Sequence, residues 1–210
     1  MKNYFKIILI LFIELTTTIS IFLLFSYLFR RQSPFLMAYL IPSLSKITLF
    51  LLVILPFTYY YRIYIRIAKV NFKKLFIYLV IFLGLKVIYQ LIFFSNIRTT
   101  FFEDLSENYF LLYFLTKITI IPILEELFFR NFALEYLIDK GKNKVISISI
   151  ISIIFGLAHT SLGMMGFFQW GTLIYFTVFS VLLCLVYLRE RNVVYPIILH
   201  SLYNALVSFI

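Results

Sequence analysis

The sequence predicts an all-α protein, a polytopic bundle of transmembrane helices with about seven spans, within a range of six to eight. Its composition and the length of its apolar runs predict this class. Of the 210 residues, 63% are hydrophobic and only 13% are charged, and the mean hydropathy is +1.01. A soluble domain carries about 25% charged and about 45–50% apolar residues. The apolar excess exceeds what a soluble core of this length buries, so we expect the chain to lie in a lipid bilayer.

Each predicted span is a mostly apolar run near the length of about 20 residues that crosses the hydrocarbon layer. The runs are Tyr4–Phe29, Phe35–Tyr61, Leu75–Ser95, Tyr109–Leu137, Val145–His159, Phe168–Leu188 and Val193–Phe209. The first is too long for the apolar part of a signal peptide. The second contains Pro42 and Pro56, and a break there would give an eighth span or a re-entrant segment. We expect a single integral membrane domain over residues 1–210, with N-terminal helices over 1–120 and motif-bearing helices over 121–210.

The loops predict the orientation. The net charge of +10 lies largely in short loops, so it indicates topology and no nucleic-acid partner. Basic loops occur at 62–74, 140–144 and 189–191, whereas residues 103–107 are acidic. We therefore expect a multi-pass protein with a cytoplasmic N-terminus, although Arg30 and Arg31 oppose this orientation. The composition, rich in Phe, Ile, Tyr and Lys, favours a bacterial plasma membrane, and the lone Cys184 excludes an internal disulfide.

Ionisable side chains inside apolar runs are rare and usually mark a paired or functional position. Glu126 and Arg130 are four residues apart on one helix, so they lie on the same face and can pair. Glu125 is rotated by about 100° and has no partner on its own helix. It is therefore the candidate general base. Pro122, one turn earlier, can loosen the helix and admit water. A structural ion pair with one additional acid is the alternative interpretation.

Two further groups occur in later spans. His159 ends the fifth run, and Gly156 beside it permits a close helix contact. His200 and Asn204 are four apart and present two hydrogen-bond donors on one face, an arrangement that can stabilise an oxyanion. The alternatives are a core histidine and interhelical hydrogen bonds that serve only packing.

Depth unites these residues into one predicted site. Glu125 lies about 22 Å along its helix from Lys140, and His159 lies about 22 Å from Lys144. The two helices are antiparallel neighbours, so the two side chains are expected at one level. His200 and Asn204 lie about 13 and 20 Å from Arg191. We therefore expect an active-site cavity among the C-terminal helices.

The three fragments resemble the signature of the CAAX protease and bacteriocin-processing family, also called the Abi family. Its pattern is Glu-Glu-x-x-x-Arg, Phe-x-x-x-His and His-x-x-x-Asn or Asp. The matching residues are Glu125, Glu126 and Arg130, then Phe155 and His159, then His200 and Asn204. Order, spacing and residue type all agree over residues 125–204, whereas residues 1–120 carry no usable motif.

The resemblance implies a glutamate-type intramembrane endopeptidase that acts on a membrane-associated peptide or protein. Glu125 and His159 would activate water, His200 and Asn204 would form the oxyanion hole, and Glu126 with Arg130 would support the site. It also implies roles in bacteriocin or pheromone processing or in self-immunity. We expect membrane lipid as a partner and no metal cofactor, with zinc as the alternative. A non-proteolytic immunity or scaffold protein, or an ion-coupled transporter, would also place ionisable groups in the membrane.

Overall fold

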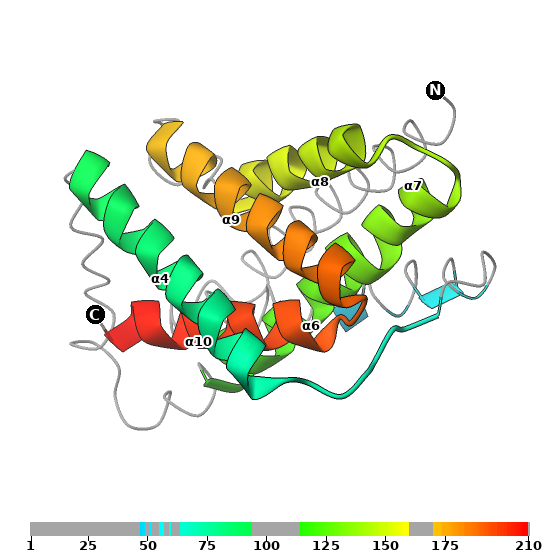
Figure 1. Cartoon of the computed structure of the whole chain (residues 1–210), viewed down its shortest axis with the longest axis horizontal. Coiled ribbons are helices and arrows are strands. Elements are labelled where there is room, and N and C mark those ends of the chain that lie inside the picture. Colours follow the sequence, from blue (N-terminus) through cyan, green and yellow to red (C-terminus); the bar gives the residue numbers. More distant parts are fainter. Residues whose placement is uncertain are drawn as a thin grey trace, which may run out of the picture.

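The computed structural model describes residues 64–93, 114–159 and 170–209, together with a few isolated positions between 47 and 59 (Figure 1). These residues are helical or irregular and include no strand, which confirms the all-α prediction for them. The spans predicted over Tyr4–Phe29 and over nearly all of Phe35–Tyr61 lie outside the described residues. The total of about seven spans therefore stays a prediction.

The described helices follow the predicted spans closely. Helix α4 covers Phe72–Phe93. One continuous helical stretch is divided by its winding into η2 (Phe114–Ile120), α6 (Ile121–Glu126), η3 (Leu127–Leu134) and α7 (Glu135–Asp139). The last three helices are α8 (Lys144–His159), α9 (Trp170–Glu190) and α10 (Val194–Phe209). Their ends differ from the predicted ends by a few residues because the polar caps, and not hydropathy, decide where a helix begins.

Asparagine side chains cap three of these helices. Asn71 Oδ1 accepts a hydrogen bond from Lys74 N at 3.2 Å at the start of α4. Asn143 Oδ1 accepts from the amides of Val145 and Ile146 at the start of α8. Asn192 Oδ1 accepts from the first amide of α10 at 3.0 Å. Each cap satisfies amides that have no partner within the helix, so each fixes the residue at which its helix begins.

The stretch from Phe114 to Asp139 is wound more widely on both sides of α6. Segments η2 and η3 are π-helical, and Pro122 lies in the first turn of α6. Proline has no amide hydrogen to donate, so the regular bonding pattern is interrupted there. Departures to π-helix often accompany functional sites because they re-aim side chains. The winding therefore changes on both sides of the Glu125–Glu126 pair.

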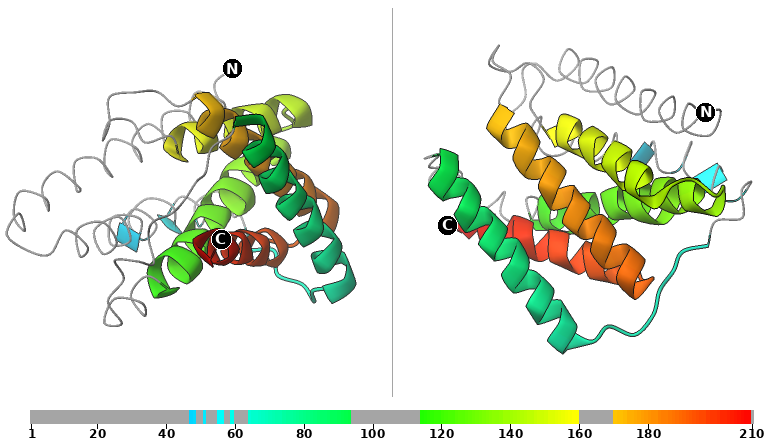
Figure 2. Two further views of the ribbon diagram at one scale, coloured as in Figure 1. Left: turned by 90° about the vertical axis from the view of Figure 1, so that its left-hand side faces the viewer. Right: turned by 45° about the horizontal axis from the view of Figure 1, so that its top comes forward.

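The helices that carry the predicted site pack against one another. Helix α10 lies between α4 on one side and α6 with η2 on the other (Figure 2). Helix α8 packs along α9 at Gly156, where an added Cβ would lie 2.3 Å from Thr177 Oγ1 and 3.0 Å from the Leu173 carbonyl oxygen. Glycine is thus required for this close helix approach.

Within the described residues, two helices are long and apolar enough to cross a membrane, Phe72–Ile92 and Trp170–Glu190. The basic loops that were predicted to share one side lie at one end of the helices. Arg66 and Arg191 both pair with Glu135, at 2.5 and 3.1 Å, and Lys74 pairs with Glu190 at 2.8 Å. Which side of the membrane this basic end faces stays a prediction.

Candidate active site

The Glu126–Arg130 pair expected from the spacing is present. It is the middle part of a longer series of hydrogen-bonded polar side chains. Arg130 Nη1 lies 3.0 Å from Glu126 Oε1, and both side chains are fully buried. Arg130 Nη2 donates to Ser180 Oγ at 2.8 Å, and the guanidinium carbon lies 4.6 Å from the centre of the Phe155 ring. His200 Nδ1 donates to the same Glu126 oxygen at 2.8 Å. One carboxylate thus connects α6 with η3 and α10, and Arg130 extends the chain to α9.

The two histidines direct the same ring atom toward Glu125. His159 Nδ1 lies 2.8 Å from the Phe155 carbonyl oxygen, and His200 Nδ1 lies 2.8 Å from the Glu126 carboxylate. A carbonyl or carboxylate oxygen only accepts, so both Nδ1 atoms carry the hydrogen. The Nε2 atoms lie 3.6 Å (His159) and 3.8 Å (His200) from Glu125 Oε2. The structure therefore brings Glu125, His159 and His200 together at one point.

Asn204 lies one turn beyond His200 and contacts a different element. Its Nδ2 donates to the carbonyl oxygen of Lys117 at 2.9 Å, in the π-helical segment η2. The sequence predicted that His200 and Asn204 would direct their donors to one point. In the structure His200 engages Glu126 while the Lys117 carbonyl orients the Asn204 amide. This contact orients the side-chain amide of Asn204.

Aromatic rings enclose the two imidazoles. Phe155 stacks on His159 with ring centres 4.1 Å apart, and Phe176 lies 4.7 Å from the same ring. Phe179 meets His200 nearly at right angles, with centres 5.5 Å apart. Rings on these faces limit access of water and lower the local dielectric, which strengthens charge interactions inside the site. His159 is the most accessible of the three clustered side chains, with 21% of its side chain exposed.

Sequence reasoning missed Ser180, Phe176 and Phe179, all on α9. The two phenylalanines resemble any other residue of an apolar span in a chain with 26 phenylalanines. Ser180 does carry a signal, because it is a polar residue in the middle of an apolar run. Serine is common at helix contacts in membranes, however, so the signal alone does not distinguish a site from packing.

The cluster also contains the donor set of a three-ligand metal site. One ligand atom each from Glu125, His159 and His200 lies within 4.8 Å of the others. Each Nδ1 is held by an oxygen acceptor, as is usual for metal-bound histidine. The 3.6 and 3.8 Å separations exceed the roughly 3.4 Å between neighbouring ligands of a tetrahedral zinc at ~2.05 Å bonds. The residue types fit zinc, and the separations would have to contract.

A comparison with known protein families finds a match. The model described as type II CAAX prenyl endopeptidase Rce1-like matches residues 107–206, which contain all three motifs. This agrees with the resemblance seen in the motifs. No curated protein and no solved structure matches this chain.

Proposed function

We propose that this chain, which over residues 107–206 belongs to the family of type II CAAX prenyl endopeptidase Rce1-like proteins, is an intramembrane endopeptidase in which Glu125 activates water. The family is a membrane-embedded protease family. The observation that carries the proposal is the convergence of both Nε2 atoms on Glu125 Oε2. The proposed substrate is a membrane-associated peptide or protein.

The geometry suits a water held between the three groups. Separations of 3.6 and 3.8 Å are too long for strong direct hydrogen bonds. An oxygen above the plane of the three atoms can lie about 2.8 Å from each of them, a normal hydrogen-bond length. Glu125 would then take a proton from that water while His159 Nε2 accepts its second hydrogen. Because Phe155 holds the opposite ring nitrogen, His159 is oriented for this role.

Hydrolysis then follows in two steps that balance. The water oxygen attacks the scissile carbonyl carbon as Glu125 takes its proton, and the carbonyl oxygen becomes negative. The C–N bond breaks when the electron pair returns, and Glu125 gives its proton to the leaving nitrogen. Glu125 is thus base and then acid, and it ends in its starting state.

Stabilisation of the oxyanion falls to His200 and Asn204. His200 Nδ1 already donates to Glu126, so Nε2 is a donor only when the ring is an imidazolium. The charges then sum to zero, with two carboxylates set against one guanidinium and one imidazolium. A balanced set is what a buried site requires, because unpaired charge is costly away from water. Asn204 would donate to the oxyanion from the amide that Lys117 orients.

The proposed mechanism needs no metal. Should zinc bind, Glu125, His159 and His200 would hold it, and it would supply Lewis-acid activation of water. In either case Glu126 and Arg130 orient His200 through the 2.8 Å hydrogen bond. The two versions differ in their response to a chelator.

The test is comparative peptidomics of cells with the wild-type chain and with Glu125→Gln. This variant keeps the shape of the side chain and removes its basicity. Glu190→Gln is the matched control, because Glu190 pairs with Lys74 at the basic end. We expect peptide products to disappear with Glu125→Gln and to persist with the control. Unchanged products in both would refute the protease proposal.

Other measurements on the Glu125→Gln variant distinguish the finer proposals. We propose a bacterial plasma membrane and a role in bacteriocin or pheromone maturation or in self-immunity. An immunity phenotype that survives Glu125→Gln would instead indicate a non-proteolytic immunity or scaffold protein. Ion flux in proteoliposomes that depends on Glu125 would favour a transporter.

A further inference from the structure

Residues 64–71, here called the strap, form a segment without regular secondary structure that precedes α4. Its inner side is bound to the helices of the site. Arg66 N donates to Asn131 Oδ1 at 3.0 Å, and Val193 N donates to Arg66 O at 2.9 Å. Asn192 Nδ2 donates to the Ala68 carbonyl at 2.8 Å. The strap is therefore held between η3, directly after Arg130, and the start of α10.

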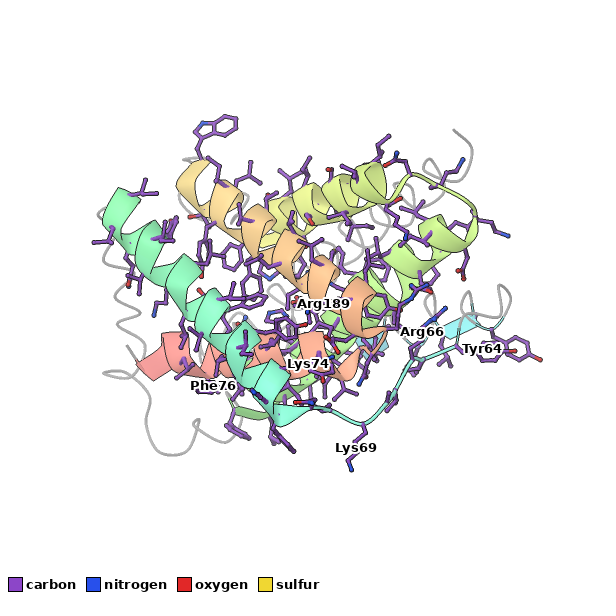
Figure 3. All side chains as sticks on the ribbon, in the orientation of Figure 1. Tyr64, Arg66, Lys69, Lys74, Phe76 and Arg189 are labelled. Carbon is purple, nitrogen blue, oxygen red and sulfur yellow. The ribbon has the colours of Figure 1, made fainter. Side chains whose placement is uncertain are left out.

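The outer side of the strap is largely apolar and accessible. Ile65 is 51% exposed, Ile67 is 71% exposed and Tyr64 is 77% exposed. Figure 3 shows Tyr64 and Lys69 pointing away from the helices, while Arg66 lies against them. Arg66 is turned inward because Glu135 holds its guanidinium at 2.5 Å. Ile65, Ile67 and Lys69 are exposed whereas Arg66 is partly buried, so these three residues lie on the outer side with Tyr64.

The position of the strap indicates what covers this side. It leads directly into α4, whose first two turns expose Phe72 (78%) and Phe76 (66%). Helix α4 is long and apolar enough to cross a membrane, and a membrane position of this helix would place these two rings in lipid. The strap precedes them by only a few residues and is therefore at the level of the headgroups. Tyrosine, aliphatic side chains and lysine are the usual composition of segments at that level.

The accessible charged side chains at the strap and at the start of α4 are positive. Lys69 and Lys73 are exposed, and neither has a carboxylate partner among the residues that the structure describes. The nearby carboxylates are occupied, Glu135 by Arg66 and Glu190 by Lys74. We propose that the strap and the first turn of α4 together bind lipid: Lys69 of the strap and Lys73 of α4 bind the phosphates of anionic phospholipids, while Ile65 and Ile67 insert between the upper acyl chains.

Lipid bound there is coupled to the site through the strap. Asn131 follows Arg130 directly in the chain, and its amide also donates to the Tyr64 carbonyl at 3.3 Å. A strap fixed at the membrane surface holds η3 and the start of α10 at a common depth. Anionic lipid would thus favour the alignment of Glu126 with His200.

The first test measures insertion without reference to catalysis. The full chain has one tryptophan, so Trp170→Phe with Ile67→Trp gives a single reporter. The protein is placed in phosphatidylcholine vesicles containing phosphatidylglycerol, and the fluorescence is quenched with brominated lipid or with aqueous iodide. Phe76→Trp in the same background is the control that lies in lipid, and Tyr64→Trp is a second reporter. We expect brominated lipid to quench Ile67→Trp at least half as strongly as Phe76→Trp. Quenching by iodide alone at both strap reporters would overturn the proposal.

The second test measures the choice of lipid. Binding of phosphatidylglycerol relative to phosphatidylcholine is compared for wild type and for Lys69→Gln with Lys73→Gln. At about fivefold per lysine near the surface, the pair is expected to lose about 30-fold of the preference at low salt. The matched control is Lys140→Gln with Lys144→Gln, at the same end but off the strap. Equal losses in both pairs would show that the lipid preference comes only from the overall positive charge at this end of the protein. That result would overturn the strap as a binding site. Wild-type protein without preference for phosphatidylglycerol would also overturn it, as expected if the true partner were an acidic protein.

Discussion

Removal of the Arg130 charge should weaken folding more than any surface substitution, because the fully buried Glu126 carboxylate then loses the guanidinium that faces it. Both side chains have no exposed surface and lie 3.0 Å apart. Loss of one partner of a buried pair costs about 3–5 kcal/mol. Arg130→Met keeps much of the apolar stem beside Phe155 and removes the charge. At about 2–4 °C per kcal/mol for a chain of this size, we expect the unfolding midpoint to fall by about 6–20 °C.

A double-mutant cycle identifies the cause. Thermal unfolding in detergent is measured for Arg130→Met, for Glu126→Gln and for both changes together. Because the double variant leaves no buried charge uncompensated at this pair, its loss should be smaller than the sum of the single losses by at least about 2 kcal/mol. Strictly additive losses, or a loss below about 1 kcal/mol for Arg130→Met, would show that the two groups do not interact as the structure indicates.

Three further predictions concern Ser180, Gly156 and the dependence on a metal. Ser180→Ala removes the side-chain hydroxyl that accepts from Arg130 at 2.8 Å. Because Ser180 acts only through Glu126 and His200, kcat should fall about tenfold with KM unchanged. A change in KM alone would contradict this positioning role. Gly156→Ala should cost about 1–3 kcal/mol of stability because the new Cβ meets α9, whereas Gly84→Ala, with nothing within 4 Å, should cost nothing; equal effects in thermal unfolding would refute the close contact. Peptidase activity of the purified chain should persist after dialysis against a zinc chelator, and loss that zinc restores would establish the metal-dependent version.

The helices were predictable because their signal is local. An apolar run of sufficient length identifies a helix from the chain alone, and the described helices α4, α8, α9 and α10 match their predicted runs. The division of residues 114–139 into α-helical and π-helical parts was not predictable. It depends on how the backbone accommodates Pro122 between packed neighbours.

The meeting of Glu125, His159 and His200 was predictable, whereas the contacts that orient them were less so. Spacing of four residues is enough to pair Glu126 with Arg130, and helix depth is enough to bring His159 to Glu125. The hydrogen bond from His200 to Glu126, and that from Asn204 to Lys117, depend on the rotation of α10 about its axis. That rotation is set by side-chain packing against α4 and α6, which no single run of sequence contains.

The sequence alone therefore predicted that the residues described by the structure are helical, which segments are apolar enough for a membrane, and that Glu125, His159 and His200 come together. Periodicity, length and composition decide these properties, and all three are local. The tertiary structure decided that Glu126 connects His200 to Arg130, that α9 contributes Ser180, and that the strap joins the basic end to the site. These contacts join residues 50 or more positions apart in the chain. They form only when the helices pack against one another. Close packing of the interior, and not the helix propensity of a single segment, decides which polar atoms come within hydrogen-bond distance.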